Sequence, residues 1–169
     1  LFGEHGVDLL HAADDELDAD AACRLGILLA CHGNPSEATA WLQRPAAEDN
    51  GMALALVDAG ESHLPGKAAE FAYELGQDEA GGRRMLPGRR PDVSEVYFEA
   101  AARAGHVDAC YRIAVRRRAA GNDADAVRWF ARAARRGHRH APGGLAEIER
   151  QIMWRGAPDV VPQEWVGGA

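Results

Sequence analysis

Cysteine is scarce in this chain of 169 residues, and its three thiols, Cys23, Cys31 and Cys110, form no CxxC pair. An odd and sparse set of cysteines in apolar stretches argues against a disulfide framework or a zinc site and favours packed thiols in a reducing compartment. Long apolar runs are absent too, since none approaches the ~18 residues that a membrane span needs. We therefore expect a cytoplasmic protein that does not enter a membrane.

Sequence motifs of the common enzyme classes are also missing: there is no phosphate-binding loop, HExxH, GxSxG or dinucleotide fingerprint. HRH at 138–140 offers two histidines without a convergent third ligand, and DDELDAD at 14–20 lacks the glycine and the glutamate spacing of a calcium loop. Cys31 and His32 end an apolar stretch where nothing identifies a positioned base. We expect neither an enzyme nor a cofactor.

The chain begins LFGEH, without a methionine and without the pattern of a secretory signal. We expect an excised fragment or a processed product, and sequence upstream of Leu1 could carry a signal or another domain. A hydrophobic fraction of 47% argues against disorder, and the length suits one compact domain or a short repeat array.

The net charge of −7 conceals a division between the two halves of the chain. Residues 1–80 contain 16 acidic and 3 basic side chains, a balance of −13, and residues 81–169 contain 10 acidic and 16 basic ones, a balance of +6. This asymmetry is the first feature of the sequence that could concern function.

One short stretch occurs twice. GNPSEATAW at 33–41 returns as GNDADAVRW at 121–129, 88 positions later. Its glycine can adopt the left-handed conformation that ends a helix, and its asparagine can accept from the first free amides of the next helix. In the first copy Pro35 fits the first turn of that helix, and Glu37 completes a capping box with Asn34. The stretch predicts two helices joined by a tight turn.

A second overlay has an offset of 32 positions. It places VYFEAAARAGHVDA (96–109) over RWFARAARRGHRHA (128–141), and periods of this size are typical of stacked supersecondary units. Small residues let neighbouring helices approach, one large ring fills each gap, and a lone helix pair cannot bury that face. The predicted seam residues are Trp41, Phe71, Tyr97, Trp129 and Phe130.

These overlays predict a helical repeat domain at 1–154 and a Pro/Gly-containing tail at 155–169. The tail is interpreted as a linker or strap with Trp154 and Trp165 packed against the array, or as a recognition segment for another protein. One helix pair is expected to be degraded, because glycine, proline and arginine crowd GGRRMLPGRRPD at 81–92. The expected helices cover 6–17, 20–32, 35–47, 51–60, 66–76, 78–86, 92–104, 108–120, 123–136 and 143–154.

The stretch DACYRIAVRRRAAGNDADAVRWFARAARRGHRHA, at 108–141, resembles a Sel-one-like repeat of the tetratricopeptide superfamily. The family shows alanine and Leu-Gly in the first helix, a glycine loop, and then Ala-x-x-Trp-Phe/Tyr-x-x-Ala-Ala-x-x-Gly. The matching residues are Ala109, Ile113, Ala114, Gly121, Ala126, Trp129, Phe130, Ala133, Ala134 and Gly137. The resemblance extends over roughly residues 6–141, and the short loops also fit a divergent tetratricopeptide array. It implies an all-α fold, a right-handed superhelical array (α-solenoid) of about four antiparallel helix pairs plus a capping helix, whose groove binds protein segments without catalysis.

Arginines replace apolar residues between the two copies, because positions 28–30 read Leu-Leu-Ala and positions 116–118 read Arg-Arg-Arg. Equivalent positions in stacked repeats face equivalent directions, so the change indicates either a solvated array end or a basic groove for an acidic or phosphorylated segment. A third reading is head-to-tail contact between the acidic half of one molecule and the basic half of another. The predicted partner-binding residues are Arg112, Arg116, Arg117, Arg128 and Arg132.

Nucleic acid is the alternative partner, since arginine clusters bind phosphates. The negative net charge, the single lysine (Lys67) and the lack of interleaved exposed aromatics argue against it. The sequence therefore predicts a non-catalytic protein-interaction module, acting as a scaffold, adaptor or regulatory domain. The alternative is a nucleic-acid-binding or regulatory domain of a larger transcription or signalling protein.

Overall fold

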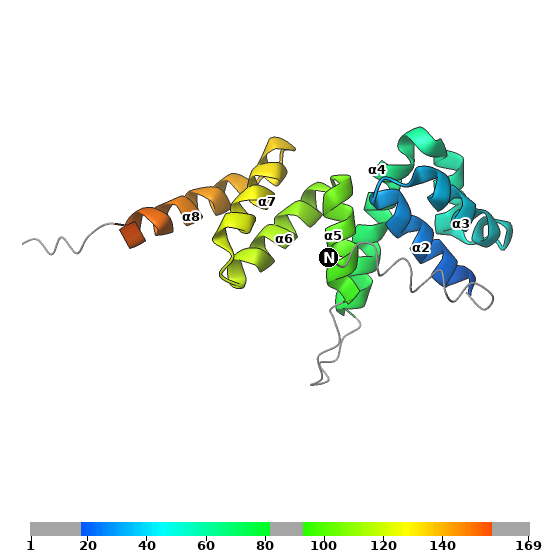
Figure 1. Ribbon diagram of the computed structural model, residues 1–169, viewed down its shortest axis with the longest axis horizontal. Helices are drawn as coiled ribbons and strands as arrows, with labels where there is room; N and C mark the ends of the chain where they lie inside the picture. The colour runs from blue at the N-terminus through cyan, green and yellow to red at the C-terminus, as the bar shows by residue number, and fades with distance from the viewer. Residues whose placement is uncertain (1–17, 82–92, 157–169) are drawn as a thin grey trace, which may run out of the picture.

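The computed structural model of the chain describes residues 18–81 and 93–156, which form seven α-helices and, within those ranges, no strand. The helices lie in an elongated row with α2 and α3 at one end and α8 at the other (Figure 1). The prediction of an all-α protein is therefore confirmed. In chain order the helices are α2 (Ala19–Cys31), α3 (Pro35–Ala47), α4 (Gly51–Gly81), α5 (Val93–Ala104), α6 (Val107–Ala119), α7 (Asp123–Arg135) and α8 (Ala141–Gly156).

Helix α4 differs from the prediction, whereas the other described helices begin and end within two residues of their expected bounds. Helix α4 consists of two helical segments separated at Gly60, where φ is 68° and ψ is 163°, so the predicted break between 51–60 and 66–76 is present, but the second segment begins directly after Gly60. The helix then continues through Gly81, because residues 77–80 contain no glycine or proline to stop it. The remainder of the predicted helix at 78–86 and the predicted helix at 6–17 lie outside the described residues.

Four turns between helices share one hydrogen-bond pattern. Each has a glycine with positive φ, and the amide of the following residue donates to the carbonyl five residues earlier. Asn34 and Asn122, the two asparagines of the repeated stretch, donate in this way to Leu29 at 3.1 Å and to Arg117 at 2.9 Å. The four glycines are Gly33, Gly105, Gly121 and Gly137, with φ of 84°, 105°, 77° and 87°.

The capping prediction is confirmed in one copy of the turn and wrong in the other. The Asn122 side chain accepts from the Asp125 amide at 3.2 Å, but the Asn34 side chain makes no capping hydrogen bond. Both asparagines have similar backbone angles, so the difference lies in side-chain orientation. Pro35 occupies the first turn of α3 as predicted.

Two phenylalanine rings are the largest of the fully buried side chains. Phe98 of α5 and Phe130 of α7 are 1% and 2% exposed. A Cβ added at Gly76 of α4 would lie 2.8 Å from the Phe98 ring, and one added at Gly144 of α8 would lie 2.6 Å from the Phe130 ring. The helices therefore touch at positions where a glycine leaves room for the ring. Of the predicted seam residues, Tyr97 and Phe130 are buried, and Trp41, Phe71 and Trp129 are partly buried against the core.

A tyrosine and a histidine accompany each of these phenylalanines. Tyr73 stacks on His106 with ring centroids 4.2 Å apart, and Tyr111 stacks on His138 at 4.1 Å. Each tyrosine also lies 5.6 Å from its phenylalanine ring. The histidines follow Gly105 and Gly137, so the sequence repeat at an offset of 32 relates the phenylalanine and the histidine of the two contacts, whereas their tyrosines are 38 positions apart.

We predict that Phe130→Ala lowers the free energy of unfolding by about 3–5 kcal/mol, because it empties a buried seam. Trp129→Ala should cost about 1–2 kcal/mol, because that ring is already partly exposed. Urea unfolding followed by circular dichroism measures both values. Equal losses in the two variants would contradict the placement of Phe130 in the seam.

His106 should make the stability of the protein depend on pH. Its Nδ1 accepts from the Ala109 amide at 3.3 Å, and burial lowers the pKa of His106 despite the carboxylates of Asp108, Glu70 and Glu74. The unfolded chain therefore binds this proton more readily, and stability that is complete above the ordinary pKa of 6.5 is lost as the pH falls below it.

We predict that His106→Asn loses less stability than the parent between about pH 7.5 and about pH 5.5, since asparagine can cap a helix but does not titrate. Urea midpoints at the two pH values give the comparison. His63→Asn, at an exposed position of α4, is the control and should keep the parent's pH dependence. A parent-like loss in His106→Asn would rule out this role.

Candidate binding surface

The structure divides the five predicted partner-binding arginines into two groups. Arg112, Arg116 and Arg117 are held by neighbouring helices, and Arg128 and Arg132 lie on α7. The guanidinium carbon of Arg112 is 4.7 Å from the centroid of the Phe98 ring and 5.8 Å from that of Tyr73, an arrangement typical of a cation–π contact. Arg112 therefore contributes to the seam between α4, α5 and α6.

The arginines at the end of α6 form ion pairs between helices. Arg116 Nη1 lies 3.6 Å from a carboxylate oxygen of Glu95 on α5. Arg117 pairs with Glu99 on α5, and its Nε lies 3.3 Å from Asp125 on α7. These two predicted binding residues thus join α6 to its two neighbours.

This arrangement explains the replacement of Leu-Leu-Ala by Arg-Arg-Arg between the two copies. In α2, Leu29 and Ala30 are buried and Leu28 packs against the core. In α6 the equivalent positions face carboxylates, and Arg118 also lies 3.6 Å from Glu147 on α8. An apolar contact in the first copy has therefore become an ionic contact in the later one.

A group of arginines on α7 and α5 forms what we call the arginine face. Arg132 Nη2 donates to the Arg103 carbonyl at 2.7 Å, and Arg136 donates to the Gly105 carbonyl. Both acceptors are at the C-terminal end of α5, where carbonyls lack helical partners and the helix dipole favours cations. The arginine face consists of Arg103, Arg128, Arg132, Arg135 and Arg136.

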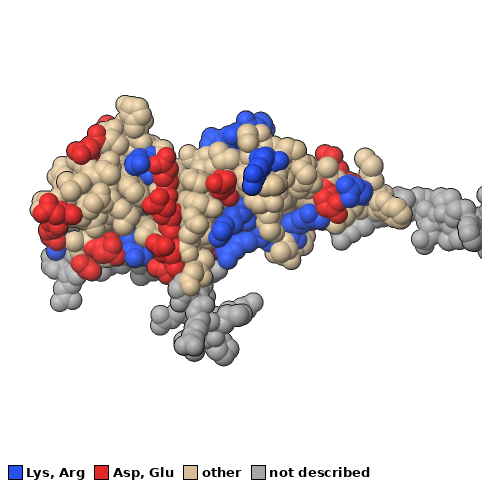
Figure 2. Space-filling view, turned by 180° about the vertical axis from the view of Figure 1, so that it is seen from behind, with Lys and Arg blue, Asp and Glu red and all other residues tan. Residues whose placement is uncertain are grey.

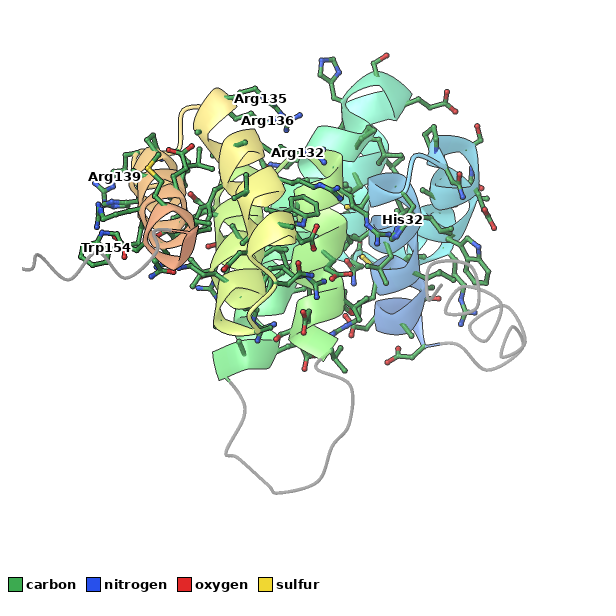
Figure 3. The ribbon with its side chains drawn as sticks, turned by 60° about the vertical axis from the view of Figure 1, so that its left-hand side comes forward. His32, Arg132, Arg135, Arg136, Arg139 and Trp154 are labelled. Atoms are coloured by element: carbon green, nitrogen blue, oxygen red, sulfur yellow. The ribbon has the colours of Figure 1, made fainter. Side chains whose placement is uncertain are left out.

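Most of the charge on the arginine face is not neutralised. Arg128 and Arg135 are exposed, and within residues 18–81 and 93–156 neither has a carboxylate within 4.0 Å. An Arg103 guanidinium nitrogen lies 3.9 Å from a carboxylate oxygen of Glu99. Arg103 Nη1 lies 3.3 Å from His32 Nε2, so the C-terminal end of α2 is next to the arginine face. Figure 3 shows Arg132, Arg135 and Arg136 together at one end of α7.

The charge division of the sequence is also visible on the molecular surface. In Figure 2 acidic side chains gather over the N-terminal half, and lysine and arginine side chains gather over the C-terminal half. Helical spacing alone groups Arg128, Arg132, Arg135 and Arg136 on one side of α7. Arg103 joins this group because Arg132 donates to its carbonyl, and the overlay at an offset of 32, which places Arg103 over Arg135, is the sequence signal for it.

The structure shows the surroundings of the cysteines and of the histidine His138 that were considered as reactive groups in the sequence. Cys23, Cys31 and Cys110 are buried free thiols, and burial raises the pKa of Cys23 to about 11 and that of Cys31 to about 12. Burial also raises the pKa of Cys110, whose Sγ donates to the Ala102 carbonyl at 3.4 Å. Thiols of this kind are poor nucleophiles at neutral pH. His138 Nε2 lies 3.4 Å from Asp108.

A comparison of the chain with protein-family models, with curated proteins and with solved structures finds no match. Across residues 18–81 and 93–156, every helix is too short or too polar to cross a membrane. The assignment of a function therefore depends on the surface described above.

We predict that Arg117→Ala lowers the free energy of unfolding by about 1–2 kcal/mol, because partly exposed ion pairs to two helices are lost. Arg128→Ala should change it by no more than about 0.5 kcal/mol, since that side chain is exposed. Chemical denaturation of both variants tests the division of the arginines into two groups. A larger loss for Arg128→Ala than for Arg117→Ala would contradict it.

Proposed function

We propose that the chain is a non-catalytic protein-interaction module of the Sel-one-like, tetratricopeptide type. Its helices form a right-handed superhelical array of about four helix pairs plus a capping helix. The four equivalent turns and the two equivalent Tyr–Phe–His contacts support this proposal, because stacked repeats reuse one turn and one seam. The buried thiols with raised pKa support a binding role over nucleophilic chemistry, and unpaired cysteines support the cytoplasm as its location.

The partner is an acidic segment of another protein, and the arginine face binds it. The observation that carries this proposal is that Arg128 and Arg135 remain exposed and without a carboxylate in the described part of the chain. Beside them Arg132 and Arg136 are held in place by carbonyls of α5, so part of the face is ordered before binding. Guanidinium groups form paired hydrogen bonds with carboxylates or phosphates.

A protein partner is favoured over nucleic acid by the other half of the molecule. Residues 1–80 carry a balance of −13, from 16 acidic and 3 basic side chains, and a long polyanion that extends beyond the arginine face would be repelled there. A short acidic segment can occupy the face without meeting that charge. Nucleic acid is therefore the competing outcome of the binding test.

We predict that a fluorescent glutamate-rich peptide binds the chain and that the double variant Arg128→Glu, Arg135→Glu weakens this binding at least about tenfold. Neither side chain has an internal ion pair in the described residues, so the variant should fold as the parent does. Fluorescence anisotropy measures the affinity, and circular dichroism checks the fold.

The control is Arg44→Glu, Arg139→Glu, which changes the net charge equally at exposed positions outside the face. Arg44 pairs with Glu48 at 3.2 Å, so circular dichroism checks the fold of this variant as well. It should bind the peptide within about threefold of the parent. An equal loss in both double variants would show a response to net charge alone and remove the arginine face as the site. If a single-stranded oligonucleotide of equal charge binds more tightly than the peptide, the partner is nucleic acid and not an acidic protein segment.

A further inference from the structure

Helix α8 occupies on α7 the place that α6 occupies on α5. The first packed residue of each is an alanine with no exposure, Ala141 in α8 and Ala109 in α6, and the two are 32 positions apart. Gly144 then brings α8 against the Phe130 ring. By this register α8 is the first helix of a further pair.

The outer face of α8 has no cover among the described residues. Helix α6 is packed on one side by α5 and on the other by α7, whereas α8 packs against α7. Met153 and Trp154 are 74% and 78% exposed, and Ala146 is exposed about two turns earlier. Figure 3 shows Trp154 on the side of α8 away from α7, so the prediction that it packs against the array is wrong. Trp165 lies outside the described residues.

We propose that this outer face binds the α8 helix of a second copy of the chain in an antiparallel, symmetric pair. The α8 outer face consists of Ala146, Glu149, Arg150, Met153 and Trp154. In an antiparallel pair centred between Glu149 and Arg150, each Glu149 comes opposite Arg150 of the other copy. Ala146 comes opposite Met153 in the same arrangement, so a small residue meets a large one on both sides of the axis.

The second copy is favoured as the occupant because the α8 outer face is complementary to itself. A twofold axis requires one patch to match itself in size and charge, and adjacent glutamate and arginine residues at the centre satisfy this condition. Arg150 is 63% exposed, and its contact with Glu147 on the same helix is a weak surface pair. Its guanidinium can therefore turn to the second copy. The α8 outer face is separate from the arginine face (Figure 3).

Sedimentation velocity of the 169-residue chain over a range of concentrations tests the proposal. We expect a species with twice the mass of one chain to form as concentration rises. Ala146→Glu should raise the dissociation constant at least about tenfold, because it places a charge on each side of the axis. Val115→Glu, at an apolar position of α6 that is 44% exposed, is the control and should associate as the parent does.

A pair of charge reversals tests the antiparallel register. Glu149→Arg and Arg150→Glu should each weaken association, because each places like charges opposite one another, and the double variant should recover it. All these positions are exposed, so circular dichroism should be unchanged. A parent chain that stays monomeric, dimers that withstand Ala146→Glu, or a double variant no better than the single ones would each overturn the proposal.

Discussion

Two phenylalanine rings, each enclosed by helices that carry a glycine at the point of contact, are the interaction on which the C-terminal half of the structure depends. Phe98 and Phe130 can be buried only because Gly76 and Gly144 have no side chain where the rings lie. The tyrosine on the neighbouring helix touches the ring and stacks on the histidine that follows the next turn. Each ring thus couples the packing of one helix to the start of the next.

This coupling also decides which charges remain available for a partner. Where helix α6 meets α5, its arginines are neutralised by Glu95 and Glu99 and belong to the framework. On α7 the equivalent interactions use backbone carbonyls, which orient Arg132 without cancelling its charge. The packing of the helices therefore neutralises the arginines at the end of α6 and leaves those of α7 available to a partner. If α8 pairs two copies, two such faces would be presented together and could bind a repeated acidic partner with higher avidity.

The sequence could predict features that are local in the chain. Gly33 and Gly121 have the left-handed conformation that their repeated context indicated, and most helix bounds follow from these turns. The break at Gly60 within α4 was predictable in the same way, whereas the start of the second segment directly after it, rather than at residue 66, was not.

The binding surface was predictable only in part. The spacing on α7 indicates that Arg128 and Arg132 share one side, whereas the neutralisation of Arg116 and Arg117 depends on carboxylates 18 to 21 positions away on α5. Whether an arginine is a structural or a free charge is decided by the packing of helices, which a sequence pattern does not contain.

The packing of the two phenylalanine rings against glycines is measured most directly by NMR, as contacts between glycine Hα protons and aromatic ring protons. The account predicts cross-peaks from Gly76 to Phe98 and from Gly144 to Phe130, with both glycines shifted upfield by the rings. Absence of these contacts in the folded protein, or unshifted Hα signals at both glycines, would contradict the packing of the two phenylalanine rings against glycines.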